Sequence, residues 1–445
     1  MPSVYTNLLR VYSWVMSKLD LLALRGGTPV IQRPFIGYST IDHTDALVVQ
    51  RVIDSGSLSQ FIGDAGSYFL GGPEIRSFES NFAEKFHTNH AVSINSWTSG
   101  LWVAIGALGL DPGSEVITSP WTMAATATTL LHWNVVPVFA EIDNRTFNLN
   151  PIDVEAKVTS STRAIVCPDI FGQSADIEAM LKICSKYGLS LVSDSAQAPF
   201  ATRNSYFAGT ASHIGGYSFN YHKHIHTGEG GMLVTNDSSL ADRMQLLRNH
   251  GEVVISRRPK EEHQYGILGM NMRLGEIEGA IGKNQLLKLD GAVASRQRAA
   301  ERFSIGLSDL IGLTIPLIEP ENTHVYYVFG MKLNLEEIGV SRVQIIDALK
   351  AEGVPGLMTG YQNLHKLPLF SEQLTYRNNP LPYSLLSPRR ALELRNQSLP
   401  VAETLHNDTF FGINWCAFAL TDSEVDLLID AFRKVWANLS SLKEA

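Results

Sequence analysis

The stretch GGYSFNYHKHIHTGEGGMLVTND, from Gly215 to Asp237, decides the fold expected for this chain. It begins with a run typical of a β-strand that ends at Ser218, places a lysine at Lys223, and closes with a glycine-rich turn at Gly228–Gly231. A lysine attacks a carbonyl when burial or neighbouring charge lowers its pKa enough to leave the amine neutral. Glycines beside it let the backbone approach a bound group that a Cβ atom would obstruct. The stretch predicts a reactive lysine next to a tight binding loop.

The segment upstream supplies a second element of the same chemistry. Taken alone, Lys223 has an ordinary explanation as a solvated loop residue, and an aspartate after a strand is commonly a helix N-cap. The apolar run LSLVSD, however, ends in Asp194 and is followed by Ser-Ala-Gln-Ala. A strand-end carboxylate and a later lysine are what an enzyme that uses pyridoxal phosphate (PLP) requires. The lysine holds the aldehyde as a Schiff base, and the carboxylate keeps the pyridine nitrogen protonated so that the ring accepts electrons.

Three motifs follow one another in the order DSAQA, SFNYHK and TGEGG. This order resembles the DegT/DnrJ/StrS family of PLP-dependent sugar aminotransferases. The signature of that family is a D-A-A-Q-A-like segment, then S-F-x-x-x-K, then a G-E-G-G or G-D-G-G turn. Lys223 stands five residues after Ser218, as in the signature. The segments PGSEVI, PVFAEID, GMNMR and PVAETLH extend the resemblance from about residue 26 to the C-terminus.

Strand-like and helix-like segments alternate between residues 90 and 237. AVSIN, EVITS, VVPVFAEID, TRAIVCPDI and LSLVSD have the pattern of strands, with helical patterns between them. This alternation predicts crossover connections and a mainly parallel sheet between helices. Ligands of such sheets bind beyond the carboxyl ends of the strands, so Ser96, Ser119, Asp194 and Ser218 are expected to converge. The resemblance implies the α/β fold type I of PLP-dependent transferases, with a smaller α+β C-terminal domain.

The chain is expected to contain three parts. Residues 1–24 form an N-terminal amphipathic extension, residues 25–293 the large PLP-binding domain, and residues 294–445 the small C-terminal domain. Charged residues interrupt the apolar residues of the extension, which is too charged for a spanning helix. We expect a helix docked on the body of the protein, with peripheral membrane contact as the alternative.

Composition excludes several classes of protein. The chain has 445 residues, of which 44% are hydrophobic and 18% charged, which predicts an ordinary globular protein. A net charge of -8 without a Lys/Arg-rich run argues against nucleic-acid binding. The three cysteines, Cys167, Cys184 and Cys416, lack metal-type spacing and indicate a reduced, cytoplasmic protein without disulfides or a metal site.

The resemblance implies catalytic roles for two residues and a cofactor contact for a third. Lys223 would form the Schiff base and move the proton between substrate carbon and cofactor carbon. Asp194 would pair with the pyridine nitrogen, and Gln197 would lie near the phenolic oxygen of the cofactor.

The resemblance also implies how the cofactor phosphate is held. Ser218, Thr98 and the backbone of Ser99 would bind it at a helix N-terminus, where the helix dipole favours an anion. Asn271, in GMNMR, matches an asparagine that reaches the phosphate from the neighbouring subunit. The resemblance therefore implies an obligatory homodimer whose active site lies at the interface.

Two segments depart from the family pattern. In the phosphate segment, usually S-G-T-A-A-L, this chain reads SWTSGL, so that bulky Trp97 replaces a small residue. Where the family usually has an aromatic residue stacked on the cofactor ring, this chain reads SPWTM. Met123 takes the aromatic's place and Trp121 lies two residues away, and either could cover the ring, since sulfur–ring contact can substitute for stacking.

Further candidates are assigned to the substrate. His222, beside Lys223, would lower the pKa of the lysine or contact the substrate. Glu229, in the glycine turn, would be structural or contact substrate hydroxyls, and His324, in HVYYVF, resembles a family position near the substrate. His222, His224 and His226 alternate, so an extended strand would place three imidazoles on one face, an arrangement that could bind zinc. The catalytic interpretation is preferred to the zinc site.

These features predict a PLP-dependent aminotransferase. It would move an amino group from glutamate or glutamine to a keto sugar, which is expected to be nucleotide-linked, with the pyridoxamine form of the cofactor as the intermediate. A dehydratase is the alternative chemistry, although related dehydratases carry histidine in place of the lysine. A non-catalytic regulatory member of the same fold and an aminocyclitol aminotransferase are further alternatives.

Overall fold

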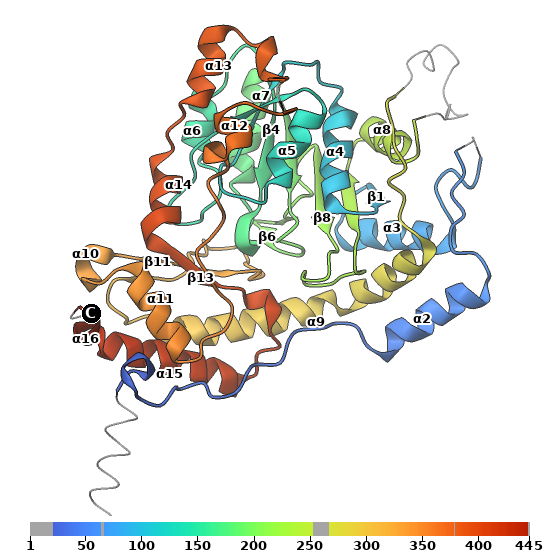
Figure 1. Ribbon diagram of the computed structural model, residues 1–445. Coiled ribbons are helices and arrows are strands. Elements are labelled where there is room, and N and C mark those ends of the chain that lie inside the picture. Colours follow the sequence, from blue (N-terminus) through green and yellow to red (C-terminus); the bar gives the residue numbers. More distant parts are fainter. Residues whose placement is uncertain (1–20, 64–65, 252–266, 378, 444–445) are drawn as a thin grey trace, which may run out of the picture.

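The computed structural model describes residues 21–63, 66–251, 267–377 and 379–443 (Figure 1). Its centre is a seven-stranded sheet in the order β1-β9-β8-β5-β4-β2-β3. Strands β3, β2, β4, β5 and β8 are parallel, and β9 is antiparallel to both of its neighbours. The mainly parallel sheet predicted from the sequence is confirmed. The strands are β1 (His90–Ile94), β2 (Glu115–Thr118), β3 (Val136–Phe139), β4 (Thr162–Pro168), β5 (Ser190–Asp194), β8 (Ile214–Ser218) and β9 (Gly231–Thr235).

Helices cover both faces of this sheet (Figure 1). Successive side chains of a strand point to opposite faces, so Ile165 and Val166 of β4 belong to two different cores. Strands of a sheet that is covered on both faces are mostly apolar, and β2, β3, β8 and β9 are buried along their whole length. The helices are α2 (His43–Asp54), α3 (Pro73–Lys85), α4 (Trp97–Leu108), α5 (Ala125–His132), α6 (Pro151–Ala156), α7 (Ile177–Tyr187) and α8 (Ser238–Arg248).

A second, antiparallel sheet forms the core of the smaller part, in the order β10-β11-β13-β12. The 32-residue helix α9 (Glu276–Leu307) runs beneath both parts and contacts α2, α3 and α15 (Figure 1). The remaining elements are β10 (Leu313–Thr314), β11 (Phe329–Leu333), β12 (Leu357–Met358), β13 (Phe410–Ile413), α10 (Leu335–Ile338), α11 (Arg342–Ala351), α12 (Pro368–Ser371), α13 (Pro388–Arg395), α14 (Pro400–Thr404), α15 (Asp422–Ala437) and α16 (Leu439–Leu442).

Several segments pack across the boundary between the two sheets. The boundary at 293–294 falls inside the continuous helix α9. Leu22 and Ile31, near the start of the described chain, pack into the core of the smaller sheet. Helices α12, α13 and α14 instead pack against the large sheet beside α5, α6 and α7 (Figure 1). The chain therefore crosses between the two cores more often than a single boundary allows.

The expected N-terminal extension, residues 1–24, lies almost entirely outside the described residues. Its last residues enter a 3₁₀ turn, Ala23–Arg25. Within the described part of the chain, no helix combines the length and apolar character needed to cross a membrane.

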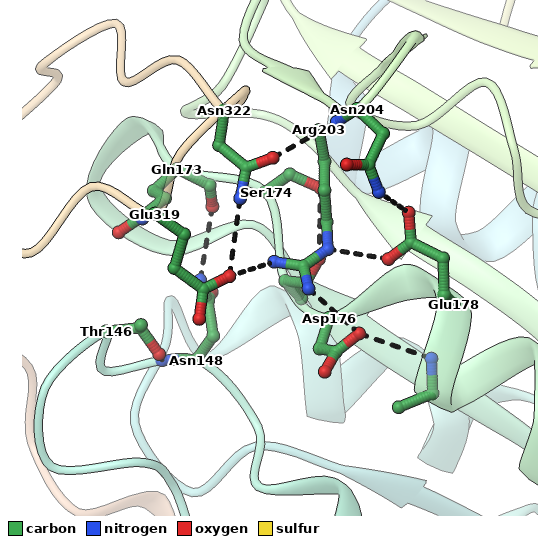
Figure 2. Close-up of polar contacts among 12 residues, drawn as sticks. Thr146, Asn148, Gln173, Ser174, Asp176, Glu178, Arg203, Asn204, Glu319 and Asn322 are labelled. Atoms are coloured by element: carbon green, nitrogen blue, oxygen red, sulfur yellow. Dashed lines mark hydrogen bonds and ion pairs between the residues drawn. The ribbon is translucent and has the colours of Figure 1, made fainter.

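One ion-pair cluster joins the large part of the protein to the segment that precedes β11 (Figure 2). Arg203 is the last residue of β6 (Thr202–Arg203), which pairs with β7 (Tyr206–Phe207), and its side chain forms ion pairs with Asp176 and Glu178 at the start of α7. Its third partner is Glu319, whose Oε2 lies 2.9 Å from Arg203 Nη1. The Arg203 side chain is only 16% exposed, so three carboxylates share one partly desolvated guanidinium. The cluster anchors the segment that continues to Tyr327 in the cavity described next.

Candidate active site

Segments that follow the carboxyl ends of β1, β2, β4, β5 and β8 enclose a cavity of about 210 Å³. This is the edge at which open α/β sheets bind ligands. Of the strand-end residues expected to converge, Ser96, Asp194 and Ser218 line the cavity and Ser119 does not. Residues from the smaller part complete the lining. The polar and aromatic lining residues are Ser96, Trp97, Thr98, Thr122, Thr126, Asp169, Asp194, Gln197, Ser218, Asn220, His222, Lys223, Glu229, Tyr327 and Tyr361.

Lys223 projects into this cavity from the turn after β8. Its side chain is buried, and its Nζ lies 4.2 Å from the ring centroid of Tyr327. Burial lowers the pKa of Lys223 from 10.5 to about 8, against the opposing influence of Asp194 and Cys416. About a tenth of the Lys223 amine is therefore neutral at pH 7, far more than for an ordinary lysine, and the neutral amine is the form that attacks an aldehyde.

Asp194 ends β5 and is also buried in the cavity wall. Its Oδ1 accepts hydrogen bonds from the Trp97 indole at 2.6 Å and the Ala196 N–H at 3.3 Å. Its Oδ2 accepts one from the Thr126 hydroxyl at 2.7 Å. The buried Asp194 carboxylate and the Lys223 amine on the same cavity fit two groups of PLP. The carboxylate would pair with the pyridine nitrogen, and the amine would react with the aldehyde.

The N-terminus of α4 forms the polar end of the cavity. Ser96 is the N-cap, and its hydroxyl accepts the N–H of Ser99 at 3.1 Å. Ser96, Thr98 and Ser218 line the cavity, whereas the Ser99 side chain does not. The hydroxyls and the helix dipole together suit a phosphate group, so the residues present fit all three parts of PLP.

The two candidates for covering the cofactor ring occupy different environments. Trp121 is fully buried, donates its indole N–H to the Tyr361 carbonyl, and packs edge-on against Phe410. It belongs to the core and does not line the cavity, so the structure does not place it over the ring. Met123 lines the cavity and is 54% exposed. Of the two, only Met123 is placed to contact a cofactor ring.

Tyr327 and Tyr361 were not singled out from the sequence, yet both line the cavity. The Tyr361 hydroxyl accepts a hydrogen bond from Gln197 Nε2 at 2.9 Å. Burial raises the pKa of Tyr361 to about 12, so its phenol stays protonated. Tyr327 belongs to the HVYYVF segment, which drew attention only for its histidine.

Two of the three expected substrate residues line the cavity, and the third does not. His222 and Glu229 line the cavity, and burial lowers the pKa of His222 to about 4, with a further contribution from Lys223. His324 does not line it: the side chain is buried, Nδ1 accepts the Tyr326 N–H, and burial lowers its pKa to about 3. These contacts indicate that His324 has a structural role and does not contact a substrate in the cavity of its own chain.

Asn271 also lies outside the cavity lining of its own chain. It is exposed at the surface, and its Oδ1 accepts a hydrogen bond from Arg273 Nε at 2.9 Å. A side chain in this position is free to reach a neighbouring molecule.

The alternating histidines do not share one face of a strand, because residues 221–225 form turns and bends. His224 is completely buried, and its Nε2 donates to the Val325 carbonyl at 2.8 Å. His226 accepts the Gly228 N–H through Nδ1. Among the residues that the structure describes, no three His, Cys, Asp or Glu side chains gather as a metal site.

Asp169 is a second buried carboxyl in the cavity wall that the sequence analysis missed. Its Oδ1 accepts the Ala175 N–H, and its Oδ2 accepts the Ser195 hydroxyl at 2.6 Å. Burial raises the pKa of Asp169 from 3.8 to about 7, and the charge of Asp194 adds to the shift. Between about pH 4 and pH 7, the native state therefore keeps a proton on Asp169 that the unfolded chain has already released.

This difference predicts a pH-dependent effect of Asp169→Asn on the apoprotein. Because the folded pKa is the higher one, Asp169 destabilises the parent progressively from about pH 4 to about pH 7. The substitution removes this penalty, so relative to the parent its free energy of unfolding should rise by roughly 2–4 kcal/mol between pH 5 and pH 8. Urea unfolding at both pH values measures it. Asp290→Asn, at an exposed site, is the control, and an equal offset at both pH values for Asp169→Asn would contradict the assignment.

A buried amine, a strand-end carboxylate and a helix N-terminus around one cavity define a PLP-dependent enzyme of fold type I. Comparison with known proteins identifies the particular group. The model of the DegT/DnrJ/EryC1/StrS aminotransferase family matches residues 59–410, so the chain belongs to this family. It is a PLP-dependent aminotransferase, and the fold, cofactor and enzyme class predicted from the sequence are confirmed.

Individual relatives cover nearly the whole chain. The spore coat polysaccharide biosynthesis protein SpsC of Bacillus subtilis is 32% identical over 84% of this chain and 92% of its own length. A Streptoalloteichus tenebrarius protein is 32% identical over 95% and 99%; it is named, provisionally, as an L-glutamine:3-amino-2,3-dideoxy-scyllo-inosose aminotransferase. Among solved structures, DesI in the presence of its TDP-sugar product has a TM-score of 0.76 and 25% identity, covering 96% of this chain and 98% of its own.

Proposed function

We propose that this enzyme transfers an amino group from glutamate or glutamine to the ketone of a nucleotide-linked keto sugar. The observation that carries the proposal is the buried amine of Lys223, which lies over the Tyr327 ring on the same cavity as Asp194. The likeness to DesI, whose structure was determined with a TDP-sugar product, supports the nucleotide-linked substrate. Retention of lysine at position 223 favours amino transfer over dehydration, for which related enzymes carry histidine.

The chemistry is divided between the cofactor and the side chains. Bound PLP supplies an aldehyde that captures the amino group and a ring that accepts the electrons of a broken C–H bond. In the proposed mechanism, Lys223 Nζ is the base that takes the proton from the donor carbon and returns it to the cofactor carbon. Asp194 fixes the protonated ring nitrogen and stabilises charge on the ring. Met123 would cover one face of the ring, and Tyr361 with Gln197 would form the polar wall near its phenolic oxygen.

The active form is proposed to be a homodimer in which the partner completes the site. Asn271 is exposed on its own chain, and its neighbours Leu268 and Met270 are 73% and 51% exposed. Tyr221, beside the cavity, is 70% exposed. Large apolar side chains left exposed together mark interaction surfaces. The three buried free thiols suit the reducing cytoplasm, where we place the enzyme.

A cyclitol ketone is the second candidate acceptor. The relative named for scyllo-inosose amination matches over 95% of this chain and 99% of its own length, which is more complete than the match to SpsC. A cyclitol lacks the nucleotide, so the two candidates differ in whether a diphosphate must be bound.

The test is an amino-transfer assay with purified enzyme and PLP. Glutamate and glutamine are supplied in parallel, with a nucleoside-diphosphate keto-deoxy sugar or a scyllo-inosose-type ketone as the acceptor, and products are measured by mass spectrometry. We expect an amino sugar that still carries the nucleotide. Amination of the cyclitol alone would replace the proposal with the second candidate. Loss of a hydroxyl group without gain of nitrogen would establish the dehydratase.

A further inference from the structure

The Asp194 carboxylate is held by side chains from two different helices. Trp97, the first residue of α4, donates its indole N–H to Oδ1, and Thr126 of α5 donates its hydroxyl to Oδ2. The two distances, 2.6 and 2.7 Å, are those of strong hydrogen bonds to a charged acceptor. One carboxylate at the end of β5 is therefore fixed at both of its oxygens.

The indole ring of Trp97 occupies a space that exists because two neighbouring residues are glycines. Its side chain is buried in the core between α4 and the sheet. A Cβ atom at Gly216 would lie 2.0 Å from the indole ring, and one at Gly100 would lie 2.4 Å from it. Any side chain at either position would displace the ring, so the glycines on β8 and α4 fix the direction of its N–H. Although Trp97 departs from the family pattern, its ring is thus accommodated by two neighbouring glycines.

The two carboxylate oxygens of Asp194 differ in how many further hydrogen bonds they can accept. A carboxylate oxygen accepts about two hydrogen bonds. Oδ1 already receives two, from Trp97 and from the backbone of Ala196. Among the described residues Oδ2 receives the Thr126 hydroxyl, which leaves one direction for the N–H of a ligand in the cavity.

We propose that Trp97 and Thr126 are positioning residues that clamp Asp194 so that Oδ2 receives the pyridine N–H of PLP. The inference rests on the proposed role of Asp194 as the partner of the ring nitrogen. Neither clamp residue needs to touch that nitrogen, since each acts by restricting rotation of the carboxylate. Preorganisation of this kind avoids reordering the charged group when the cofactor binds.

The experiment compares PLP with its deaza analogue, in which carbon replaces the pyridine nitrogen. Dissociation constants for both are measured by absorbance titration of the apoenzyme, the Trp97→Phe and Thr126→Val variants, and Asp194→Ala. Each clamp variant should bind PLP about tenfold or more weakly than the parent, because a charge-assisted hydrogen bond is lost. Affinity for the analogue, which has no ring N–H, should stay within about twofold of the parent value. Trp102→Phe, elsewhere on α4 and packed on Trp133, is the control and should change neither affinity.

The results separate the clamp from the role of Asp194. An equal loss for PLP and for the analogue in Trp97→Phe would show that the indole only fills space, and would overturn the clamp. The clamp would also fail if both variants bound PLP normally while Asp194→Ala lost PLP affinity selectively. If Asp194→Ala lost no selectivity, the proposed role of Asp194 itself would be wrong. Should Trp97→Phe fail to fold, Thr126→Val makes the same comparison at the other oxygen.

Discussion

Replacement of Lys223 with alanine is expected to lower the rate of amino transfer by at least about a thousandfold. The variant loses both the amine that binds the cofactor aldehyde and the base that moves the proton. The side chain is buried, and its removal enlarges an existing cavity. It forms no ion pair with the residues that the structure describes, so the fold should tolerate the change. The measurement is the turnover rate with saturating PLP, amino donor and keto sugar.

A control must separate the loss of this amine from the loss of a lysine elsewhere. Lys186→Ala is suitable, because Lys186 is 63% exposed and pairs with Glu155 on the surface. It should retain the parent rate. Turnover within about tenfold of the parent in Lys223→Ala would contradict the proposed role of Lys223 in proton transfer.

Replacement of Glu352 with alanine is expected to cause a large loss of stability, about 3–5 kcal/mol in the free energy of unfolding. Glu352 is fully buried at the end of α11. Its carboxylate accepts the backbone N–H groups of Ala23 and Val30 and pairs with Lys434 of α15 at 2.9 Å. Alanine leaves two donors and a nearly buried ammonium without their acceptor. Urea unfolding followed by circular dichroism measures the change.

Asp347→Ala on the same helix is the matched control. Asp347 and Lys350 are 52% and 60% exposed and lie 3.7 Å apart. An exposed pair contributes about 0–1 kcal/mol, so this substitution should have little effect. If the two substitutions cost the same, the buried link between the start of the described chain, α11 and α15 does not stabilise the fold as the structure indicates.

The central sheet and the convergence of its strand ends could be predicted because both depend on local patterns. Alternating strand and helix segments specify crossover connections, and Asp194 and Ser218 each stand where an apolar run ends. Lys223 could be assigned because its distance from Ser218 along the chain matches a family signature.

Other features depend on contacts between distant segments. Trp121 and Met123 are two residues apart and both apolar, and packing against Phe410 decides which of them enters the core. Gln197 meets Tyr361 across 164 residues of sequence. The HVYYVF segment offers several aromatic residues, and only the path of the chain shows that Tyr327 rather than His324 lines the cavity.

The boundary between the two parts also depends on contacts between distant segments. Helical periodicity shows that residues near 294 are helical but not that one helix is continuous through them. Hydrophobic pattern identifies buried faces in α12, α13 and α14 without showing which sheet they cover. That assignment requires the tertiary contacts with the large sheet.

The most direct test of the account is to find which residue binds the cofactor covalently. The purified enzyme is incubated with PLP, treated with borohydride to reduce the Schiff base to a stable amine, and digested for mass spectrometry. We expect a single pyridoxyl-modified peptide, with the added mass on Lys223, and no such peptide when the amino donor, glutamate or glutamine, is added before the reduction. Modification of another lysine, or a Lys223 peptide that stays unmodified while PLP is bound, would contradict it.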